Sequence, residues 1–268
     1  MVGWPWPTSR RRERGEAWWS GREKISVILP TLNEESSVER SVRSCLGKTK
    51  GRGTNRVEVV VVDGGSRDDT VRRARRAGAR VVSAERGRGL QQDVGSKAAS
   101  GDLILFLHAD SELPEGYDAL LHDTVRKASR ERQRSEVWGA FAELRIRSKG
   151  PLLRVVEFGV KQRTKLLHKP YGDQCLFFHR DAYESCGGFK RVPFMEDYDV
   201  VHRQRRRGIP PILLDGRVTT SGRRWKERGV LPVFLLNQAL ILSWHLGISP
   251  QALKELYYKG KPPKEACR

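Results

Sequence analysis

The chain has 268 residues, 51 basic and 32 acidic side chains, a formal net charge of +19, and 38% hydrophobic residues. This length allows a full core and predicts one large domain, alone or with an appendage, and the composition is that of a soluble globular protein. The positive charge indicates an anionic partner: nucleic acid, a phosphorylated substrate or an anionic membrane. The four cysteines form no C-x-x-C pair, so no zinc site is expected.

The first 22 residues are rich in Trp, Pro and Arg and show no hydrophobic periodicity. This composition predicts a basic disordered arm, which either tethers the chain to a membrane or nucleic acid or is a plain extension. The arm contains no continuous apolar segment like that of a signal peptide. We therefore expect free thiols, a reducing compartment and a cytoplasmic location, with peripheral contact to a membrane left open.

Short apolar runs alternate with helical patterns between residues 25 and 107. Strands are predicted at 25–29, 57–62, 80–83 and 103–107, with helices at 36–46, 71–77 and 90–100. Strands and helices that alternate at these lengths indicate βαβ units and a largely parallel sheet. The expected fold class is α/β, with a Rossmann-like nucleotide-binding sheet flanked by helices.

The pattern after Pro114 is mixed. Helices are expected from there to about residue 130, at 151–167 and at 196–207; strands are expected at 137–147 (an edge or antiparallel strand), 173–179, 212–214 and 218–220. Residues 231–246 are strongly apolar but include Asn237, Gln238 and His245, so we expect a helix that packs on the domain or lies in a membrane interface. The predicted division is an arm at 1–22, a catalytic domain at 23–225 and a C-terminal helical appendage at 226–268.

Polar side chains follow four of the predicted strands. They are Thr31, Asn33 and Glu34; Asp63; Arg86 and Arg88; and His108 and Asp110. Ligands bind outside the carboxyl ends of the strands in open α/β sheets, so these groups should converge on one site. Any one of them has a simpler explanation, since residues 63–66 are also typical of an Asx turn. Together they predict a site in which Asp110 handles a cation or a phosphate.

Four motifs together resemble the family 2 glycosyltransferases of the GT-A fold. They are VILPTLNEE at 27–35, VDGGSRDDT at 62–70, GDLILFLHAD at 101–110 and FMEDYD at 194–199. The resemblance runs in order over residues 24–224. The His-Ala-Asp form, with GRGLQQ at 87–92 before it and GDQ at 172–174 after it, is similar to a bacterial-type subgroup with poorly known acceptors.

The resemblance implies an inverting transferase that moves a sugar from a UDP- or GDP-sugar to an acceptor hydroxyl. The donor nucleotide would be bound by Pro30, Thr31, Asn33, Glu34, Asp63, Arg86 and Arg88. The D-x-D carboxylates of such enzymes hold Mg²⁺ or Mn²⁺, and here Asp110 is kept while His108 replaces the first Asp. His108 either binds the ion, which would favour Mn²⁺, or has a packing role beside it.

The acceptor side is implied by the later motifs. Asp197 would be the general base that deprotonates the acceptor hydroxyl, with Glu196 in support, although carboxylates that begin a helix are also ordinary dipole partners. The remaining residues expected there are Gly172, Asp173 and Gln174, together with Arg223, Arg224 and Trp225. The last three either touch the diphosphate or the acceptor, or form a solvated loop.

Two other functions and one further partner fit parts of the sequence. A nucleic-acid-binding protein would explain the charge of +19, but it leaves the strand-end carboxylates unexplained, because carboxylates repel phosphate. A nucleotidyltransferase would need a basic Gly-rich loop after the first strand, where this chain has Thr31-Leu-Asn-Glu-Glu35. The basic residues at 223–228, which precede the apolar stretch at 231–246, also suggest contact with an anionic membrane.

Overall fold

The computed structural model describes residue 19 and residues 23–46 and 57–258. The predicted basic arm, apart from Trp19, therefore lies outside the described residues. The strands are β1 (Ile25–Thr31), β2 (Val57–Asp63), β3 (Arg80–Ser83), β4 (Leu103–Phe106), β5 (Trp138–Arg147), β6 (Leu176–His179) and β7 (Ile212–Ser221). The helices are α1 (Val38–Leu46), α2 (Thr70–Arg76), α3 (Arg88–Ala98), α4 (Tyr117–Ala128), α5 (Pro151–Leu167), α6 (Arg180–Ser185), α7 (Glu196–Arg206), α8 (Arg223–Arg228), α9 (Val230–His245) and α10 (Pro250–Tyr258).

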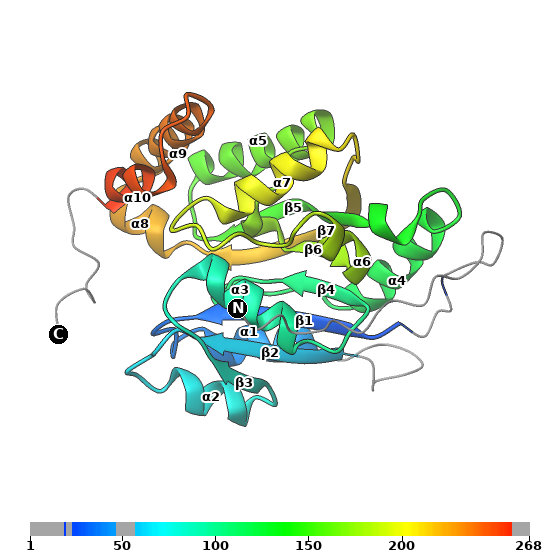
Figure 1. The fold of residues 1–268 in the computed structure, drawn as a ribbon. Coiled ribbons are helices and arrows are strands. Elements are labelled where there is room, and N and C mark those ends of the chain that lie inside the picture. The colour runs from blue at the N-terminus through cyan, green and yellow to red at the C-terminus, as the bar shows by residue number, and fades with distance from the viewer. Residues whose placement is uncertain (1–18, 20–22, 47–56, 259–268) are drawn as a thin grey trace.

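The strands form one mixed sheet in the order β3-β2-β1-β4-β6-β5-β7 (Figure 1). The four strands from β3 to β4 are parallel, as the strand–helix alternation predicted. β6 is antiparallel to both β4 and β5, and β7 is parallel to β5. The predicted fold class, a Rossmann-like sheet flanked by helices, is confirmed.

Alternate residues of the central strands face two separate cores. Val27 and Leu29 of β1 join a core with α1, α4 and α5, whereas Ile28 joins a second core with α6 and α7. Because successive side chains point to opposite faces of a strand, a strand covered on both faces is apolar throughout. All seven residues of β1 are accordingly buried.

The structure differs from the expected elements in two places. Residues 212–221 form one strand rather than two, because β7 pairs with β5 along its length and a register shift between Phe141 and Glu143 takes up the irregularity. Residues 172–174 form a 3-10 turn, so β6 starts only at Leu176. The predicted domain division at residue 225 remains a prediction, and that residue lies within α8.

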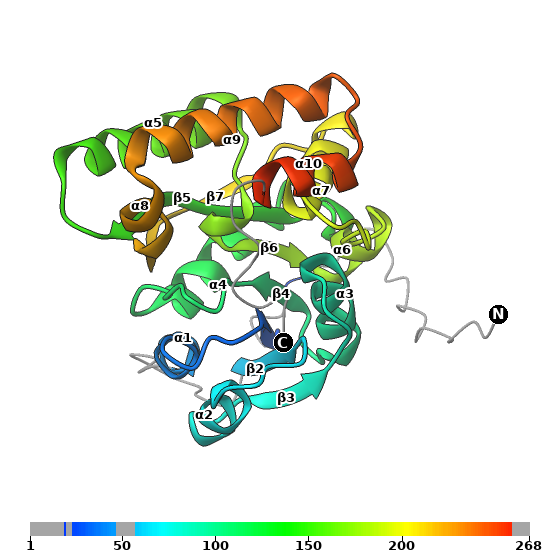
Figure 2. The same cartoon turned by 90° about the vertical axis from the view of Figure 1, so that its left-hand side faces the viewer.

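The C-terminal helices pack against the start of α7. Leu240 of α9 and Leu253 of α10 form a small core with Met195 and Tyr198. Figure 2 shows α9 and α10 beside α7, on the side of the molecule opposite α2. None of the helices in the described residues is long and apolar enough to cross a bilayer.

Candidate active site

The carboxyl ends of β1 and β2 lie side by side in the sheet, and one buried side-chain amide bonds to both. Thr31 lies opposite Asp63 in the parallel pair, and its hydroxyl is 3.3 Å from the Asp63 carboxylate. The side-chain amide of Gln91 on α3 donates to the carbonyls of Thr31 and Val62, at 2.8 Å each. α3 is therefore fixed against the two strand ends on which the donor side was predicted.

Asp63 closes a tight turn after β2. Its Oδ2 accepts from the main-chain N–H groups of Gly65 and Ser66, at 3.0 and 2.9 Å, and its Oδ1 accepts from the Ser66 hydroxyl. Ser66 also accepts from the N–H of Asn33, whose own side chain accepts from Arg67. The donor edge is thus a network in which Asp63 holds the turn, in addition to any contact it makes with a nucleotide.

Glu34, Asp110 and Arg223 form a charged group beside this edge. Arg223 donates to Glu34 at 2.9 Å although the two residues lie 189 positions apart. Burial and the Glu34 carboxylate raise the pKa of Asp110, and Arg223 opposes that shift. Two carboxylates and one guanidinium therefore lie where a diphosphate and a cation were expected. Arg223 begins α8, and its contact with a ligand remains a prediction.

His108 faces a different set of groups. Burial and the guanidinium of Arg88 lower its pKa to about 4, while Asp197 acts in the opposite direction. Its Nε2 is buried and has no hydrogen-bond partner among the described residues. At neutral pH His108 is therefore an uncharged imidazole with a free ring nitrogen, which can ligate a metal or contact a substrate.

Glu196 and Arg88 form an ion pair across the site. Arg88 Nε donates to Glu196 Oε1, and only 2% of the Glu196 side chain is exposed, compared with 40% of Arg88. Burial raises the pKa of Glu196 and Arg88 counteracts it. The pair connects α3 to α7. The two helices approach closely at Gly89, where a Cβ would lie 3.3 Å from the Cβ of Glu196. Glu196 therefore positions Arg88.

Asp197 is held by a main-chain group from another segment. Its Oδ2 accepts from the N–H of Gly172 at 2.9 Å and its Oδ1 from the N–H of Tyr198. A Cβ at Gly172 would lie 2.8 Å from that Oδ2, so a larger residue would displace the carboxylate. Asp197 is only partly buried, and it can still meet a substrate.

Asp173 and Arg224 carry buried polar atoms that lack partners. Within the described residues, neither Oδ1 of Asp173 nor Nε of Arg224 has a hydrogen bond. Burial raises the pKa of Asp173, Arg163 counteracts this and Asp197 adds to it. Arg224 donates to Asn237 at 2.8 Å and lies 4.7 Å from the centre of the Tyr257 ring. Buried unpaired groups of both signs near Asp197 are suited to a polar ligand.

Four predicted residues lie at the margin of the site. Gln174 is fully buried and its amide bonds to Phe141, Thr164 and Arg163, so it supports the Gly172 turn. Trp225 packs against the larger core, and Pro30 is buried within β1. Arg86 is exposed in the loop before α3. These four, like the other predicted site residues, remain predictions as ligand contacts.

The residues suit a divalent ion only in part. No group of three or more His, Cys, Asp or Glu side chains that could hold a metal occurs in the described part of the chain. Mg²⁺ and Mn²⁺ in phosphate sites often use one or two protein ligands, with the remainder from phosphates and water. Asp110 beside Glu34 fits such a site. His108 supplies a free nitrogen, but it is perturbed by Arg88 and Asp197 rather than by Asp110.

Some residues at the site were not anticipated from the sequence. Arg163 stacks 3.6 Å from the centre of the Tyr171 ring, and Tyr198 bonds to His245 at 2.7 Å. Tyr257, from α10, approaches Arg224 and Arg228. Tyr198, His245 and Tyr257 lie on three different helices, and an aromatic residue on a helix gives no signal of this kind by itself.

This chain is similar to glycosyltransferases in sequence and in fold. Residues 26–137 match the family model described as glycosyl transferase family 2. Glucosyl-3-phosphoglycerate synthase of Mycobacterium tuberculosis is 39% identical over 104 residues, which cover 35% of this chain and 31% of that protein. A mannosyltransferase of Pyrobaculum calidifontis, solved with GDP-Man and Mn²⁺, superposes with a TM-score of 0.57 at 19% identity over 78% of this chain and 60% of that one. TarS of S. aureus, solved with UDP-GlcNAc, superposes at 0.54 with 18% identity over 74% and 58%.

The fold is that of the GT-A glycosyltransferases. Residues 26–137, which include three of the four motifs, form a glycosyltransferase family 2 domain, as those motifs indicated. The matched segment spans about a third of the length of the curated relative.

Proposed function

We propose that the protein is an inverting glycosyltransferase, which moves a sugar from a nucleotide-diphosphate sugar to an acceptor hydroxyl. The observation that carries the proposal is the approach of Asp197, on α7, to His108 and Arg88 from the nucleotide-binding half. An acceptor between these halves would have the Asp197 carboxylate on one side, and on the other the Arg88 guanidinium, which suits a diphosphate. The donors bound by the two structural neighbours, GDP-Man and UDP-GlcNAc, support either base.

The proposed mechanism gives each side chain one task. Asp197 removes the proton of the acceptor hydroxyl as the sugar is attacked, and the Gly172 N–H orients its carboxylate. Arg88, held by Glu196, and Arg223, held by Glu34, offset negative charge on the leaving nucleoside diphosphate. A divalent ion held by Asp110, with His108 as a second candidate ligand, would supply further charge stabilisation there.

Donor binding is tested by a panel of nucleotide sugars in thermal shift assays. UDP-glucose, UDP-GlcNAc and GDP-mannose are each measured with Mn²⁺, with Mg²⁺ and with EDTA. A donor present at 100 times its Kd stabilises the folded state by about 2.7 kcal/mol, and so raises Tm clearly. We expect one donor to respond, with Mn²⁺ at least as effective as Mg²⁺. The absence of a Tm shift with every donor would contradict the proposed function. Full turnover in EDTA, after the metal has been shown to be absent, would contradict the metal dependence.

The location belongs to the same proposal. We expect a cytoplasmic protein, in keeping with the cysteines at positions 45, 175 and 186, which are free. We also propose peripheral contact with an anionic membrane, which the basic residues at 223–228 and the apolar stretch at 231–246 suggested. The outward-facing leucines of α9 support this contact, since Leu231 and Leu242 are each 62% exposed.

A further inference from the structure

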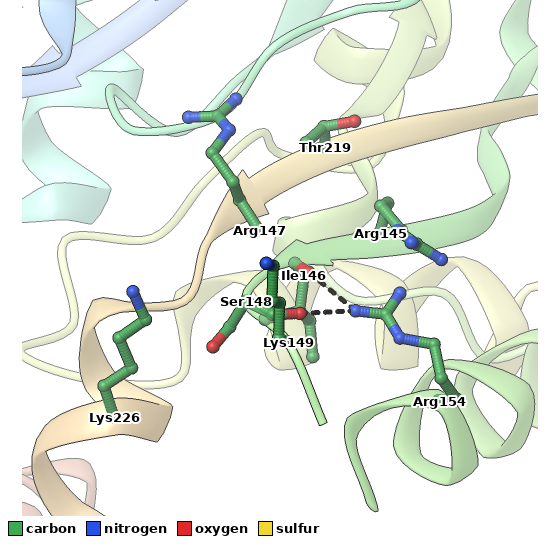
Figure 3. Close-up of a pocket in the computed structure, with 8 residues that line it drawn as sticks. All are labelled: Arg145, Ile146, Arg147, Ser148, Lys149, Arg154, Thr219 and Lys226. Atoms are coloured by element: carbon green, nitrogen blue, oxygen red, sulfur yellow. Dashed lines mark hydrogen bonds between the residues drawn. The ribbon is translucent and has the colours of Figure 1, made fainter. Parts of the chain in front are cut away.

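A basic pocket lies beside the candidate active site but shares no lining residue with it. Its volume is about 740 Å³, and it is lined by the end of β5, the start of α5, β7 and α8 (Figure 3). The lining residues are Arg145, Ile146, Arg147, Ser148, Lys149, Arg154, Thr219 and Lys226. Five of these eight side chains are cationic and none is acidic.

The charges of this pocket are only partly neutralised. Arg145 and Arg154 pair with Glu157, and Arg147 pairs with Glu112. Arg154 also donates to the carbonyls of Ile146 and Ser148, which fixes the pocket wall. Among the described residues, Lys149 and Lys226 have no carboxylate partner, and both are exposed. The pocket therefore keeps two uncompensated ammonium groups, which suit a phosphate.

The outer face of α9 is largely apolar although it faces water, and Gln238 is an exposed polar residue on it. Leu231, Leu235 and Leu242 share one face of the helix and are 56–62% exposed, while Val233 and Leu240 on the opposite face are buried. No Asp, Glu, Lys or Arg occurs in the 16 residues of α9. A helix that is apolar on both faces normally buries both, so the outer face of α9 lacks a partner.

The outer face of α5 has the same character. Leu152, Val155 and Phe158, together with Leu166 further along, are 61–71% exposed, while Leu153 and Thr164 face the interior. α5 and α9 lie at the same end of the molecule in both Figure 1 and Figure 2, opposite α2. α5 begins at the basic pocket, and α9 follows directly after α8, which carries Lys226 into that pocket.

We propose that α5, α9 and the basic pocket form one docking surface for an anionic phospholipid bilayer, with a lipid phosphate in the pocket. In a bilayer the phosphates lie just outside the acyl region, which matches a cationic pocket at the ends of two exposed apolar helix faces. A second copy of the chain suits the surface less well, because a symmetric contact would bring the two uncompensated basic pockets towards each other. The inference rests on the membrane contact proposed above and assigns that contact to particular residues.

The test measures binding of the full chain to vesicles, without donor or acceptor. Wild type is sedimented with vesicles of phosphatidylcholine alone and with vesicles that contain one quarter phosphatidylglycerol, at low and high salt. The pocket variant is Lys149→Gln/Lys226→Gln, and its control is Arg75→Gln/Arg76→Gln on α2, which removes the same charge from the opposite end of the molecule. The helix variants are Val155→Ser/Phe158→Ser and Leu235→Ser/Leu242→Ser, which change exposed side chains.

We expect wild type to bind the anionic vesicles and to bind less at high salt. The pocket variant should bind about 25-fold more weakly, from about fivefold for each of its two basic residues, and the α2 control should bind like wild type. Each helix variant should also bind more weakly. Equal binding by the pocket variant and its control would overturn the assignment of the phosphate to the pocket. Unchanged binding by both helix variants would overturn the assignment of the apolar faces to the bilayer. A wild type that binds no anionic vesicle would overturn the membrane contact itself, and dimerisation abolished by the helix variants would assign the surface to a second copy.

Discussion

Asp63 and Asp197 are the carboxylates that we propose for the donor and acceptor sides, and the structure holds them in different ways. Asp63 accepts from Gly65 and Ser66, two and three residues further on in its own turn. Asp197 accepts from Gly172, 25 residues away, on a turn that Gln174 supports from within the core. The donor carboxylate is thus fixed by local backbone, and the acceptor carboxylate by long-range packing.

The two sides also differ in how completely their polar atoms are paired. Thr31, Asn33 and Asp63 bond to their neighbours on the donor side. By contrast, buried atoms of Asp173, which lies near Asp197, and of Arg224, which lies near Asp173, have no partner within the described residues. Buried unpaired groups cost free energy unless a ligand or water completes them. The difference indicates a preformed donor edge and an acceptor region that its ligand completes.

The largest expected effect separates chemistry from binding. Asp197→Asn keeps the bond from Gly172 but removes basicity, so kcat should fall by about 10²- to 10⁴-fold while donor affinity stays nearly unchanged. Steady-state kinetics and calorimetric titration with the nucleoside diphosphate measure the two quantities. Near-normal turnover would remove Asp197 as the base, and a greater loss in Glu196→Gln would move the base one residue earlier.

The second prediction tests whether Asp63 does more than close its turn. Asp63→Ala removes acceptors from two N–H groups and should destabilise the fold by about 1–3 kcal/mol. Asp63→Asn keeps one acceptor for the turn, so it should fold nearly as well but bind UDP or GDP about tenfold or more weakly, because it lacks the charge. Urea unfolding and calorimetry compare the variants. Unchanged nucleotide affinity in Asp63→Asn would leave Asp63 with the turn alone.

The third prediction concerns the ion pair that links the two sides. Glu196→Gln replaces the carboxylate that pairs with Arg88 by a buried neutral amide. The free energy of unfolding should fall by about 1–2 kcal/mol, a modest loss because Arg88 still reaches water. Asp69→Asn is the matched control, because Asp69 pairs with Arg72 at an exposed helix start. It should change stability by less than about 0.5 kcal/mol. Equal effects in denaturant unfolding would mean that the buried pair does not connect α3 to α7 as described.

The fourth prediction is a change in pH dependence. Burial lowers the pKa of His108 to about 4 from an ordinary value of 6.5. Between these values the unfolded chain binds more protons at this position, so the contribution of His108 to stability falls as pH falls from 6.5 to 4. His108→Asn should therefore lose less stability than wild type over this range when unfolding midpoints are measured at several pH values. Parallel curves would contradict the buried neutral imidazole.

His179 provides an internal comparison for that experiment. Burial lowers its pKa to about 3, and it lies at the end of β6 rather than at the site. His179→Gln should reduce the same acid sensitivity, and its effect should add to that of His108→Asn. Donor binding should change in His108→Asn and stay the same in His179→Gln. This contrast distinguishes a site histidine from a histidine of the core.

The sequence by itself determined the donor edge. Apolar runs such as 57–62 are readable as strands buried on both faces, and polar residues at successive strand ends must meet where parallel strands end. The turn at Asp63 is local, so a short segment contains all the residues that form it. A helix with Pro at its start was also predicted at 151–167, and α5 has those bounds in the structure.

Only the tertiary structure decided what surrounds Asp197 and what remains uncovered. The Glu34–Arg223 pair joins residues 189 positions apart, and periodicity within a segment says nothing of such partners. The apolar stretch at 231–246 did not reveal which of its residues face the core, because large apolar residues occur all around α9. Packing on Met195 and Tyr198 turned Leu240 inward and left Leu235 and Leu242 facing water. The acceptor side and the docking surface therefore depend on how distant elements pack, which is a property of the whole fold.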